Sequence, residues 1–305
     1  MSTYRTVKGY NIKKVTSDPA NPKIGQIWYN DTSKQIKVRT EVAAAWASGG
    51  NYPATAHGIQ GDGTQTAAFA AGGSSDIDET NEYDGSSWTA SNDMGTGRYT
   101  FGANGTQTAG LAVAGWSPGN TANVEEYNGT SWAEQNNLPA VTQQNTGCGT
   151  QTAGLKFGGN PDAGTDEYDG TSWTAGGDMN TARYAMAGAG TQTAALAAGG
   201  HPGVDSSEEY NGSAWTEGNN LNTARKDFSG SGIQTLALVF GGASSTATEQ
   251  YDGTSYTTTA ALSTGRRLGA GAGTGQLALY SAGQPTNSTE EFTEVSANTK
   301  TVDVS

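Results

Sequence analysis

Short runs of small apolar residues alternate with polar turn residues along most of the chain, and this alternation repeats about every forty residues. The motif Gly-Thr-Gln-Thr-Ala begins at four positions and relaxed copies begin at two more, namely Gly63, Gly105, Gly149, Gly190, Gly232 and Gly273. The spacings are 42, 44, 41, 42 and 41 residues. A period of this length with glycine and aromatic landmarks is typical of a β-propeller that uses one repeat for each blade.

The fourth repeat shows how one period would become four strands, which we name a to d. Residues 183–189 are expected to form strand a, residues 192–198 strand b, residues 208–210 strand c, and the segment around Trp215 strand d. An Asn-Gly or Asp-Gly pair follows strand c in five repeats. These residues tolerate positive φ, as a tight hairpin turn requires.

Side-chain size predicts where each strand lies. Strands a and b consist largely of Gly, Ala and Thr, whereas strands c and d contain an aromatic column five residues from a second one. The first column is Tyr83, Tyr127, Tyr168, Tyr210, Tyr251 and Phe292, and the second is Trp88, Trp132, Trp173, Trp215 and Tyr256. Blades crowd at the axis and splay at the rim, so small residues belong inside and aromatic residues outside.

The sixth repeat lacks strand d, and the N-terminal part of the chain offers a replacement. The segment around Trp46 matches the segment around Trp173 and has no strands a and b of its own before it. Pairing the Trp46 strand with the sixth repeat would close the ring and remove both open edges. We therefore predict an all-β, six-bladed propeller. Residues 26–39 are expected to form an added hairpin that pairs with residues 301–304, and the alternative is seven blades if this hairpin enters the ring.

Charge divides the chain into two parts. Residues 1–40 contain eight Lys and Arg against two Asp, which gives +6, and the rest of the chain has −19 of the total of −13. We predict a basic attachment segment at residues 1–40, with Lys8, Lys13, Lys14 and Trp28 as its contacts, and a propeller at residues 41–305. The alternatives for the segment are a solvated tail and a contact with the acidic propeller. An acidic body disfavours nucleic acid as a partner. No apolar run is long enough to span a membrane, so we expect no membrane insertion.

The candidate enzymes with this architecture need residues that the sequence does not bring together. A galactose-oxidase-like copper site would have to use Cys148, His57 and His201, which occupy different repeat positions. A sialidase-like site would need an arginine cluster, but Arg98, Arg183, Arg225 and Arg266 recur at one repeat position, which favours a structural role. Cys148 is expected to be a small buried residue. We predict no catalytic residues, no metal and no cofactor.

The loop between strands b and c differs from repeat to repeat, whereas the other turns are nearly constant. Loops on a rigid scaffold often bind ligands, so this rim is the predicted binding surface. Trp116 is the leading candidate because an exposed indole stacks on sugar rings. The other candidates on this rim are Asn160, Asp162, His201, Asp205, Asp76 and Asp78. The alternatives are that the loops vary because nothing constrains them, and that the carboxylates are simply solvated.

Two resemblances extend this interpretation. The order Gly199-Gly200, Tyr210, Trp215, Leu221, Thr223 and Arg225 resembles the kelch repeat, although Ala56 and Thr142 replace the arginine in two repeats. The near-identical repeats, preceded by Gly25-Gln26-Ile27-Trp28-Tyr29-Asn30, also resemble kelch-type proteins of marine bacteriophages that are associated with tail fibres or virions.

The second resemblance implies a structural virion protein that acts in host attachment or particle assembly. It further implies synthesis in the host cytoplasm, a location at the particle surface or tail, other virion proteins as partners, multiple copies per particle, and a host-surface glycan as a ligand. The alternatives are a kelch protein-interaction scaffold and, less favoured, a propeller enzyme.

Overall fold

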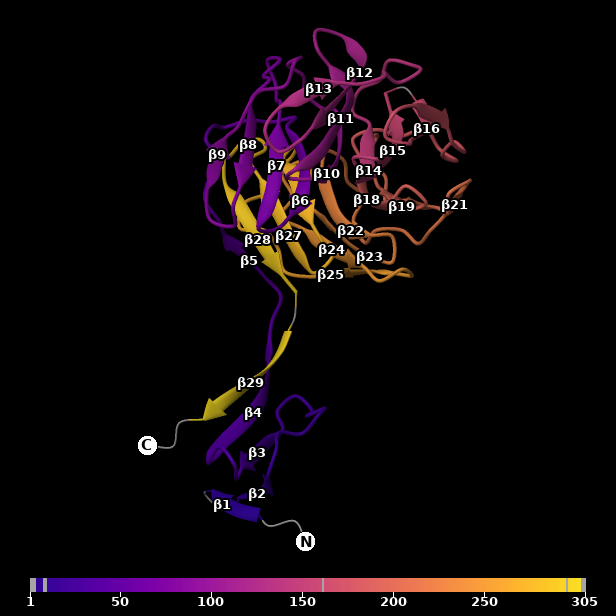
Figure 1. Ribbon diagram of the computed structural model, residues 1–305. Coiled ribbons are helices and arrows are strands. Elements are labelled where there is room, and N and C mark those ends of the chain that lie inside the picture. Colours follow the sequence, from indigo (N-terminus) through magenta and orange to yellow (C-terminus); the bar gives the residue numbers. More distant parts are fainter. Residues whose placement is uncertain (1–3, 8–9, 161, 295, 303–305) are drawn as a thin grey trace. The chain divides into compact units, whose positions relative to one another are not determined.

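The computed structural model describes residues 4–7, 10–160, 162–294 and 296–302, and every element in these ranges is a β-strand (Figure 1). None of the described elements is a helix that could cross a membrane. The chain divides into two units. Unit 1 comprises Met1–Ala45 and Glu294–Ser305, and unit 2 comprises Trp46–Thr293.

Unit 2 is built from six four-stranded antiparallel sheets, which we number in chain order. Sheet 1 contains β6 (Gln60–Thr64), β7 (Ala67–Ala71), β8 (Thr80–Tyr83) and β9 (Trp88–Ala90). Sheet 2 contains β10 (Gly102–Thr106), β11 (Ala109–Trp116), β12 (Asn120–Tyr127) and β13 (Trp132–Glu134). Sheet 3 contains β14 (Thr146–Thr150), β15 (Ala153–Gly159), β16 (Asp162–Tyr168) and β17 (Trp173–Ala175).

The remaining sheets of unit 2 repeat this order. Sheet 4 contains β18 (Ala187–Thr191), β19 (Ala194–Ala198), β20 (Ser207–Tyr210) and β21 (Trp215–Glu217). Sheet 5 contains β22 (Ser229–Ile233), β23 (Leu236–Phe240), β24 (Thr248–Tyr251) and β25 (Tyr256–Thr258). Sheet 6 contains β26 (Ala270–Gly273), β27 (Leu277–Ser281), β28 (Thr289–Thr293) and β5 (Ala45–Ser48).

Strand a begins later than expected in the fourth repeat, at Ala187 instead of residue 183. The reason is that Ala185 has a φ of 53°, which lies outside the β region, so the extended strand can begin only after this residue.

The first strands of the six sheets contact one another in chain order, and β26 of sheet 6 contacts β6 of sheet 1. The strand around Trp46 is the fourth strand of sheet 6, as predicted. Trp46 Nε1 donates to Thr248 Oγ1 of sheet 5 at 3.0 Å, which is the contact that tryptophans make in the other sheets. This architecture of blade-like sheets is consistent with a β-propeller.

The described chain forms seven sheets, one more than the six blades expected. The additional sheet belongs to unit 1 and has five strands in the order β1 (Tyr4–Val7), β2 (Tyr10–Val15), β3 (Ile27–Asn30), β4 (Gln35–Val42) and β29 (Ser296–Val302). As predicted, β3 and β4 form a hairpin, and Thr301 of β29 pairs with Lys37 of β4.

The predicted boundary of the second domain, residues 41–305, is therefore wrong at its C-terminal end. The chain leaves sheet 6 after Thr293, and residues from Glu294 onward belong to unit 1. The physical reason is that β29 forms its hydrogen bonds with β4 over seven residue pairs and so cannot extend sheet 6.

Crowding between the first strands explains their glycines. A Cβ on Gly147 of β14 would lie 2.0 Å from Asn104 Oδ1 of the preceding sheet, and a Cβ on Gly188 of β18 would lie 2.4 Å from Thr146 Cγ2. Real Cβ atoms do not approach other atoms so closely, so a side chain at either position would force its neighbour to shift. The gradient from small inner residues to large outer ones follows the prediction.

A tyrosine on the third strand of sheets 1 to 5 is hydrogen-bonded to a glutamate of the preceding sheet. Tyr210 Oη donates to Glu167 Oε1 at 2.6 Å, and burial together with this hydrogen bond raises the pKa of Tyr210 to about 12. The same contact is made by Tyr83 with Glu291, Tyr127 with Glu82, Tyr168 with Glu126, and Tyr251 with Glu209. The Tyr83 contact joins sheet 1 to sheet 6.

The Gln of the Gly-Thr-Gln-Thr-Ala motif has a structural role that joins neighbouring sheets. Gln192 Nε2 donates to the carbonyl oxygens of Gly154 at 3.1 Å and Tyr168 at 2.7 Å in the preceding sheet. Equivalent bonds are made by Gln65, Gln107, Gln151 and Gln234. These buried carbonyls lie beside the seam, and the glutamine gives each of them a donor.

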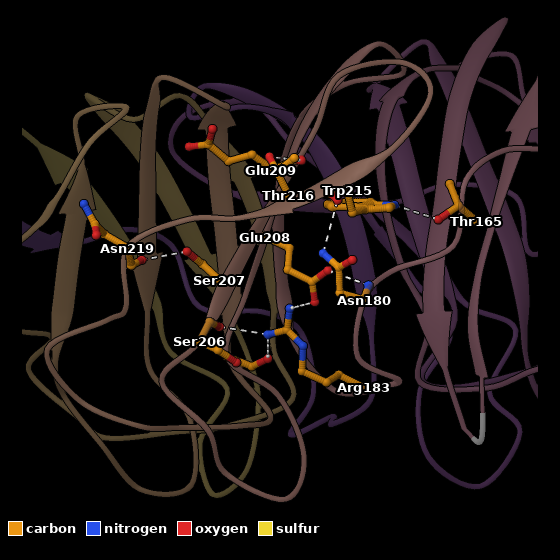
Figure 2. A network of polar contacts seen from close by, with 11 residues as sticks. Thr165, Asn180, Arg183, Ser206, Ser207, Glu208, Glu209, Trp215, Thr216 and Asn219 are labelled. Carbon is orange, nitrogen blue, oxygen red and sulfur yellow. Dashed lines mark hydrogen bonds and ion pairs between the residues drawn. The ribbon is translucent and has the colours of Figure 1, made fainter.

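A buried ion pair fixes the segment that enters most sheets of unit 2. Arg183 Nη2 lies 2.7 Å from Glu208 Oε1, and its Nη1 donates to the carbonyls of Gly199 and Ser206 (Figure 2). The same pair recurs as Arg98 with Glu125, Arg225 with Glu249, and Arg266 with Glu290. All four arginines are buried, which agrees with the structural role predicted for this column.

The two repeats without this arginine also lack its glutamate. Asn81 stands at the glutamate position of sheet 1, and its Nδ2 donates to Tyr52 Oη at 3.0 Å. Asp166 stands there in sheet 3, and Lys156, which is 2% exposed, lies 3.3 Å from its Oδ2. The residue that replaces the glutamate thus has a partner in both sheets, and no carboxylate at this position is left unpaired in the described chain.

The tryptophans on the fourth strands also contact the preceding sheet. Trp215 Nε1 donates to Thr165 Oγ1 at 2.9 Å (Figure 2), and the same bond joins Trp88 to Thr289 and Trp132 to Thr80. Trp173 is an exception, because Val124 replaces the threonine and Trp173 Nε1 has no hydrogen-bond partner within the described residues.

Replacing Val124 with Thr is expected to raise the free energy of unfolding by about 1 kcal/mol, because the new hydroxyl would accept from Trp173 Nε1. Urea denaturation of the wild type and Val124→Thr measures the change. In a Trp173→Phe background the donor is absent, so Val124→Thr should then be neutral or destabilising. An equal effect in both backgrounds would contradict the missing-acceptor explanation.

Candidate functional site

Six residues of unit 2 form a closed circle of backbone hydrogen bonds, one at the start of each sheet. Each amide donates to the carbonyl oxygen of its counterpart in the preceding sheet, over distances of 2.7 to 3.0 Å. The members, in the order of donation, are Gly58, Leu268, Asp227, Ala185, Gln144 and Thr100, whose amide donates back to Gly58. We call this set the mouth circle.

All six members of the mouth circle have positive φ, between 52° and 61° for the five that are not glycine. Left-handed backbone costs about 1–3 kcal/mol at a non-glycine residue. It persists here because each residue both donates to one neighbouring sheet and accepts from the other. The mouth circle therefore fixes the backbone at one end of the central channel.

The residue before each member of the mouth circle lies beside a residue at the end of the second strand or shortly after it. We call these the mouth pairs: His57 with Ser74, Tyr99 with Trp116, Gln143 with Asn160, Tyr184 with His201, Lys226 with Ala243, and Arg267 with Gln284. In five of them a backbone hydrogen bond joins the two residues, such as His201 N to Tyr184 O at 2.8 Å. Five mouth pairs thus share one backbone contact, and the chemistry of the side chains differs in all six.

Both residues are aromatic in two of the mouth pairs. The rings of Tyr184 and His201 are stacked, with centroids 4.4 Å apart and an angle of 11° between their planes. The rings of Tyr99 and Trp116 are tilted at 48° with centroids 6.5 Å apart. All four side chains are half-buried, so each ring presents only part of its surface to solvent.

The structure brings three of the predicted rim residues, Trp116, Asn160 and His201, into mouth pairs. Trp116 is half-buried and ends β11, so the expectation of a freely exposed loop indole is wrong. The reason is that β11 and β12 extend further than predicted and pair Trp116 with Asn120. Sheet 3 behaves alike, since Gly159 pairs with Asp162 and leaves almost no loop.

The four predicted carboxylates do not gather at one place. Asp162 lies in β16, where its Oδ2 is 3.3 Å from the buried Lys156 Nζ, so it serves the structure of sheet 3. Asp76 and Asp78 are exposed in one loop, and Asp205 is exposed in another. Within the described residues, no group of three or more His, Cys, Asp or Glu has the geometry to hold a metal ion.

The central channel contains a cavity of about 130 Å³ lined mainly by the first strands. At the position before the glycine of the repeated motif, the residues are Asp62, Asn104, Cys148, Ala189, Ser231 and Ala272. Cys148 is a buried free thiol, as expected, and burial raises its pKa. Asp62 accepts hydrogen bonds from the amides of Gly63 at 2.7 Å and Gly105 at 2.9 Å.

The proposed contacts of the N-terminal segment are mostly used inside unit 1. Trp28 is fully buried, and its Nε1 donates to Asp18 Oδ1 at 2.9 Å, so it cannot dock onto a partner as predicted. Lys14 Nζ lies 3.1 Å from Asp31 Oδ2. Lys13 is exposed, and Lys8 lies outside the described residues.

Sequence reasoning missed half of each mouth pair. The overlooked residues are His57, Tyr99, Gln143, Tyr184, Lys226 and Arg267, which follow the arginine column or its replacements. A signal was present, because this position differs in chemistry between repeats although the flanking residues are similar. The variation is easier to recognise in the loops, because they also differ in length.

No family model and no curated protein matches this chain. Among solved structures, the chain is similar to that of YjhT, with a TM-score of 0.67 and 13% sequence identity over 83% of this chain and 100% of that one. At this identity the similarity concerns the fold alone. It supports the assignment of unit 2 to the β-propeller class.

The carboxyl group of Asp62 should make stability depend on pH. Burial raises the pKa of Asp62 to about 7, although the two amide donors lower it. Because the folded pKa is above the usual value near 4, the cost of ionising Asp62 is absent below about pH 4 and complete above about pH 7. The stability contributed by the neutral form is therefore lost as the pH rises through this window.

Replacing Asp62 with Asn removes this titration. The difference in unfolding free energy, Asp62→Asn minus wild type, should increase by about 2–3 kcal/mol between pH 5 and pH 8. Urea denaturation at both pH values measures it. A difference that is independent of pH would show that Asp62 titrates near its ordinary pKa.

Proposed function

We propose that the chain is a non-catalytic recognition protein of a bacteriophage particle. Unit 2 is a closed six-bladed propeller whose mouth pairs contact a host-surface glycan, and unit 1 attaches the protein to the particle. The protein is present in multiple copies at the virion surface or tail after synthesis in the host cytoplasm.

The observation that supports recognition most directly is the contrast between the mouth pairs and the repeated contacts at the seams between sheets, which we call the frame. The tyrosine, glutamine and arginine contacts repeat at nearly every seam, whereas the mouth pairs differ in all six sheets. Side chains that vary on a fixed scaffold are typical of binding surfaces. The polar groups that a propeller enzyme would need are instead consumed in ion pairs of the frame, which favours a non-catalytic role.

The chemistry of the mouth favours a sugar as the ligand. Aromatic rings offer apolar faces to the C–H groups of a sugar, and Gln143, Asn160 and Gln284 provide amides that donate to and accept from hydroxyls. A shallow surface of this kind binds weakly for each copy. Several copies on one particle would raise the overall affinity through avidity.

The charge of unit 1 favours its role in attachment. Residues 1–40 have a net charge of +6, while the remainder of the chain has −19. Lys13 and Lys23 are exposed, and no ion pair in the described chain involves either of them. An acidic surface on a neighbouring virion protein is the partner that this charge would attract.

Replacing Trp116 with Ala tests the host contact. The variant is expected to fold, because Trp116 is half-buried outside the seam contacts, and particles with it should adsorb to the host about tenfold more weakly. Ile233→Ala, which removes a side chain that is 53% exposed at the other end of sheet 5, is the matched control and should adsorb normally. Normal adsorption combined with failed assembly would make the mouth an assembly surface.

Reversing charge in unit 1 tests the attachment. Lys13→Glu with Lys23→Glu should lower the amount of protein in purified particles several-fold, since both charges would repel an acidic partner, with no change in the unfolding midpoint. Quantitative immunoblotting of particles measures incorporation. Unchanged incorporation at both low and high salt would remove the electrostatic basis for attachment through unit 1.

A further inference from the structure

Most cations of unit 2 are buried in ion pairs. Trp46–Thr293 contain seven Lys and Arg against twenty-four Asp and Glu, a net charge of −17. Five of the seven, namely Arg98, Lys156, Arg183, Arg225 and Arg266, are at most 5% exposed and are paired with carboxylates. Lys226 and Arg267 are the two that remain.

Both remaining cations belong to mouth pairs, in neighbouring sheets. Lys226 precedes Asp227 and Arg267 precedes Leu268, and these two members of the mouth circle are joined by the bond from Leu268 N to Asp227 O at 3.0 Å. His57 occupies the same position in the next sheet, since Gly58 N donates to Leu268 O at 2.7 Å. Three groups that are cationic or become so on protonation thus lie in consecutive sheets around the mouth.

Neither Lys226 nor Arg267 has an ionic partner among the described residues. The guanidinium of Arg267 donates to Gln284 Oε1, from Nη2 at 2.9 Å and from Nε at 3.3 Å, and this neutral amide orients it without cancelling its charge. The partner of Lys226 in its mouth pair is Ala243, an exposed residue whose methyl group offers no acceptor. Both charges therefore remain available to a ligand.

The carboxylates around these cations do not neutralise them. Asp227 follows Lys226 directly, but it lines the channel, and no ion pair joins the two in the part of the chain described. No member of the mouth pairs is acidic. Elsewhere unit 2 is acidic enough to repel an anion, so an anionic ligand would be accepted at this place and disfavoured on the rest of the surface.

We propose that Lys226 and Arg267 form an anion-binding site at the mouth, which recognises the carboxylate or sulfate group of an acidic polysaccharide. This assignment rests on the proposed function and names the class of glycan. Gln284 orients Arg267 through Nε and Nη2, so the N–H groups of Nη1 and Nη2 at the end of the guanidinium suit a planar or tetrahedral oxyanion, and Lys226 adds a second charge. The Tyr184 and His201 rings of neighbouring sheet 4 provide a surface for the sugar ring.

Binding of the full chain to immobilised polysaccharides tests the proposal. The probes are dextran sulfate, polygalacturonate and uncharged dextran, which separate sulfate from carboxylate recognition. The wild type should bind at least one of the two anionic probes and not dextran, and Lys226→Ala with Arg267→Ala should weaken that binding about tenfold. Failure of the wild type to prefer either anionic probe over dextran would overturn the site.

Unit 1 is basic and could itself bind a polyanion, so a matched variant is required. Lys13→Ala with Lys23→Ala removes the same charge from exposed positions of unit 1 and should leave polysaccharide binding nearly unchanged. If it weakens binding as much as the mouth variant does, the interaction is non-specific and the proposal is wrong. Unfolding midpoints of both variants should match the wild type, because neither changes a buried contact.

Two further measurements complete the test. Lys226→Arg with Arg267→Lys keeps both charges but alters the donor geometry, so it should bind with an intermediate affinity. A single-stranded oligodeoxynucleotide should compete poorly, and equal competition would indicate charge recognition without sugar specificity.

Loss of anion binding in Lys226→Ala with Arg267→Ala while Trp116→Ala particles adsorb normally would confirm the site and reject the proposed host contact. Unchanged anion binding in Lys226→Ala with Arg267→Ala, together with weakened adsorption of Trp116→Ala particles, would reject only the anion site.

Discussion

The circle of backbone hydrogen bonds at the mouth is the constraint on which the rest of unit 2 depends. Each member must adopt positive φ so that its amide and its carbonyl both point along the circle, and this requirement sets the start of strand a at the same place in every sheet. The first strands are thereby held close together. Close approach in turn demands glycine at positions such as Gly147 and Gly188, where a Cβ would collide with the neighbouring sheet.

The seams between sheets show how polar contacts are preserved when the repeat changes. At the seam between sheets 5 and 6, Phe292 replaces the usual tyrosine, Gln250 replaces its glutamate partner, and Gly275 stands where the motif has glutamine. Gln250 Nε2 donates to Gly275 O at 2.8 Å instead. A lone glutamate or glutamine there would have left a buried group without a partner, which costs more than the hydrogen bond itself contributes.

The pairing of buried charges in unit 2 explains why the mouth differs electrostatically from the rest of the surface. The frame pairs each buried arginine with a carboxylate, so its charges produce little field outside the protein. The residue that follows each arginine takes no part in that ion pair and belongs to a mouth pair. Lys226 and Arg267 occupy that position in two sheets, which sets a small cationic region against an acidic body. Structural and recognition roles thus fall on adjacent residues of one segment.

The sequence by itself determined the all-β class, the repeat length, the turn positions and the strand around Trp46 that completes sheet 6, because these depend on local preferences and on a visible period. Only the tertiary structure decided which side chains meet. Lys226 and Arg267 are 41 residues apart, and Tyr184 lies 17 residues from His201, so their proximity arises from the packing of successive sheets. The structure also assigned residues after Thr293 to unit 1, since the choice between extending sheet 6 and pairing with β4 depends on backbone hydrogen bonds that no local pattern specifies.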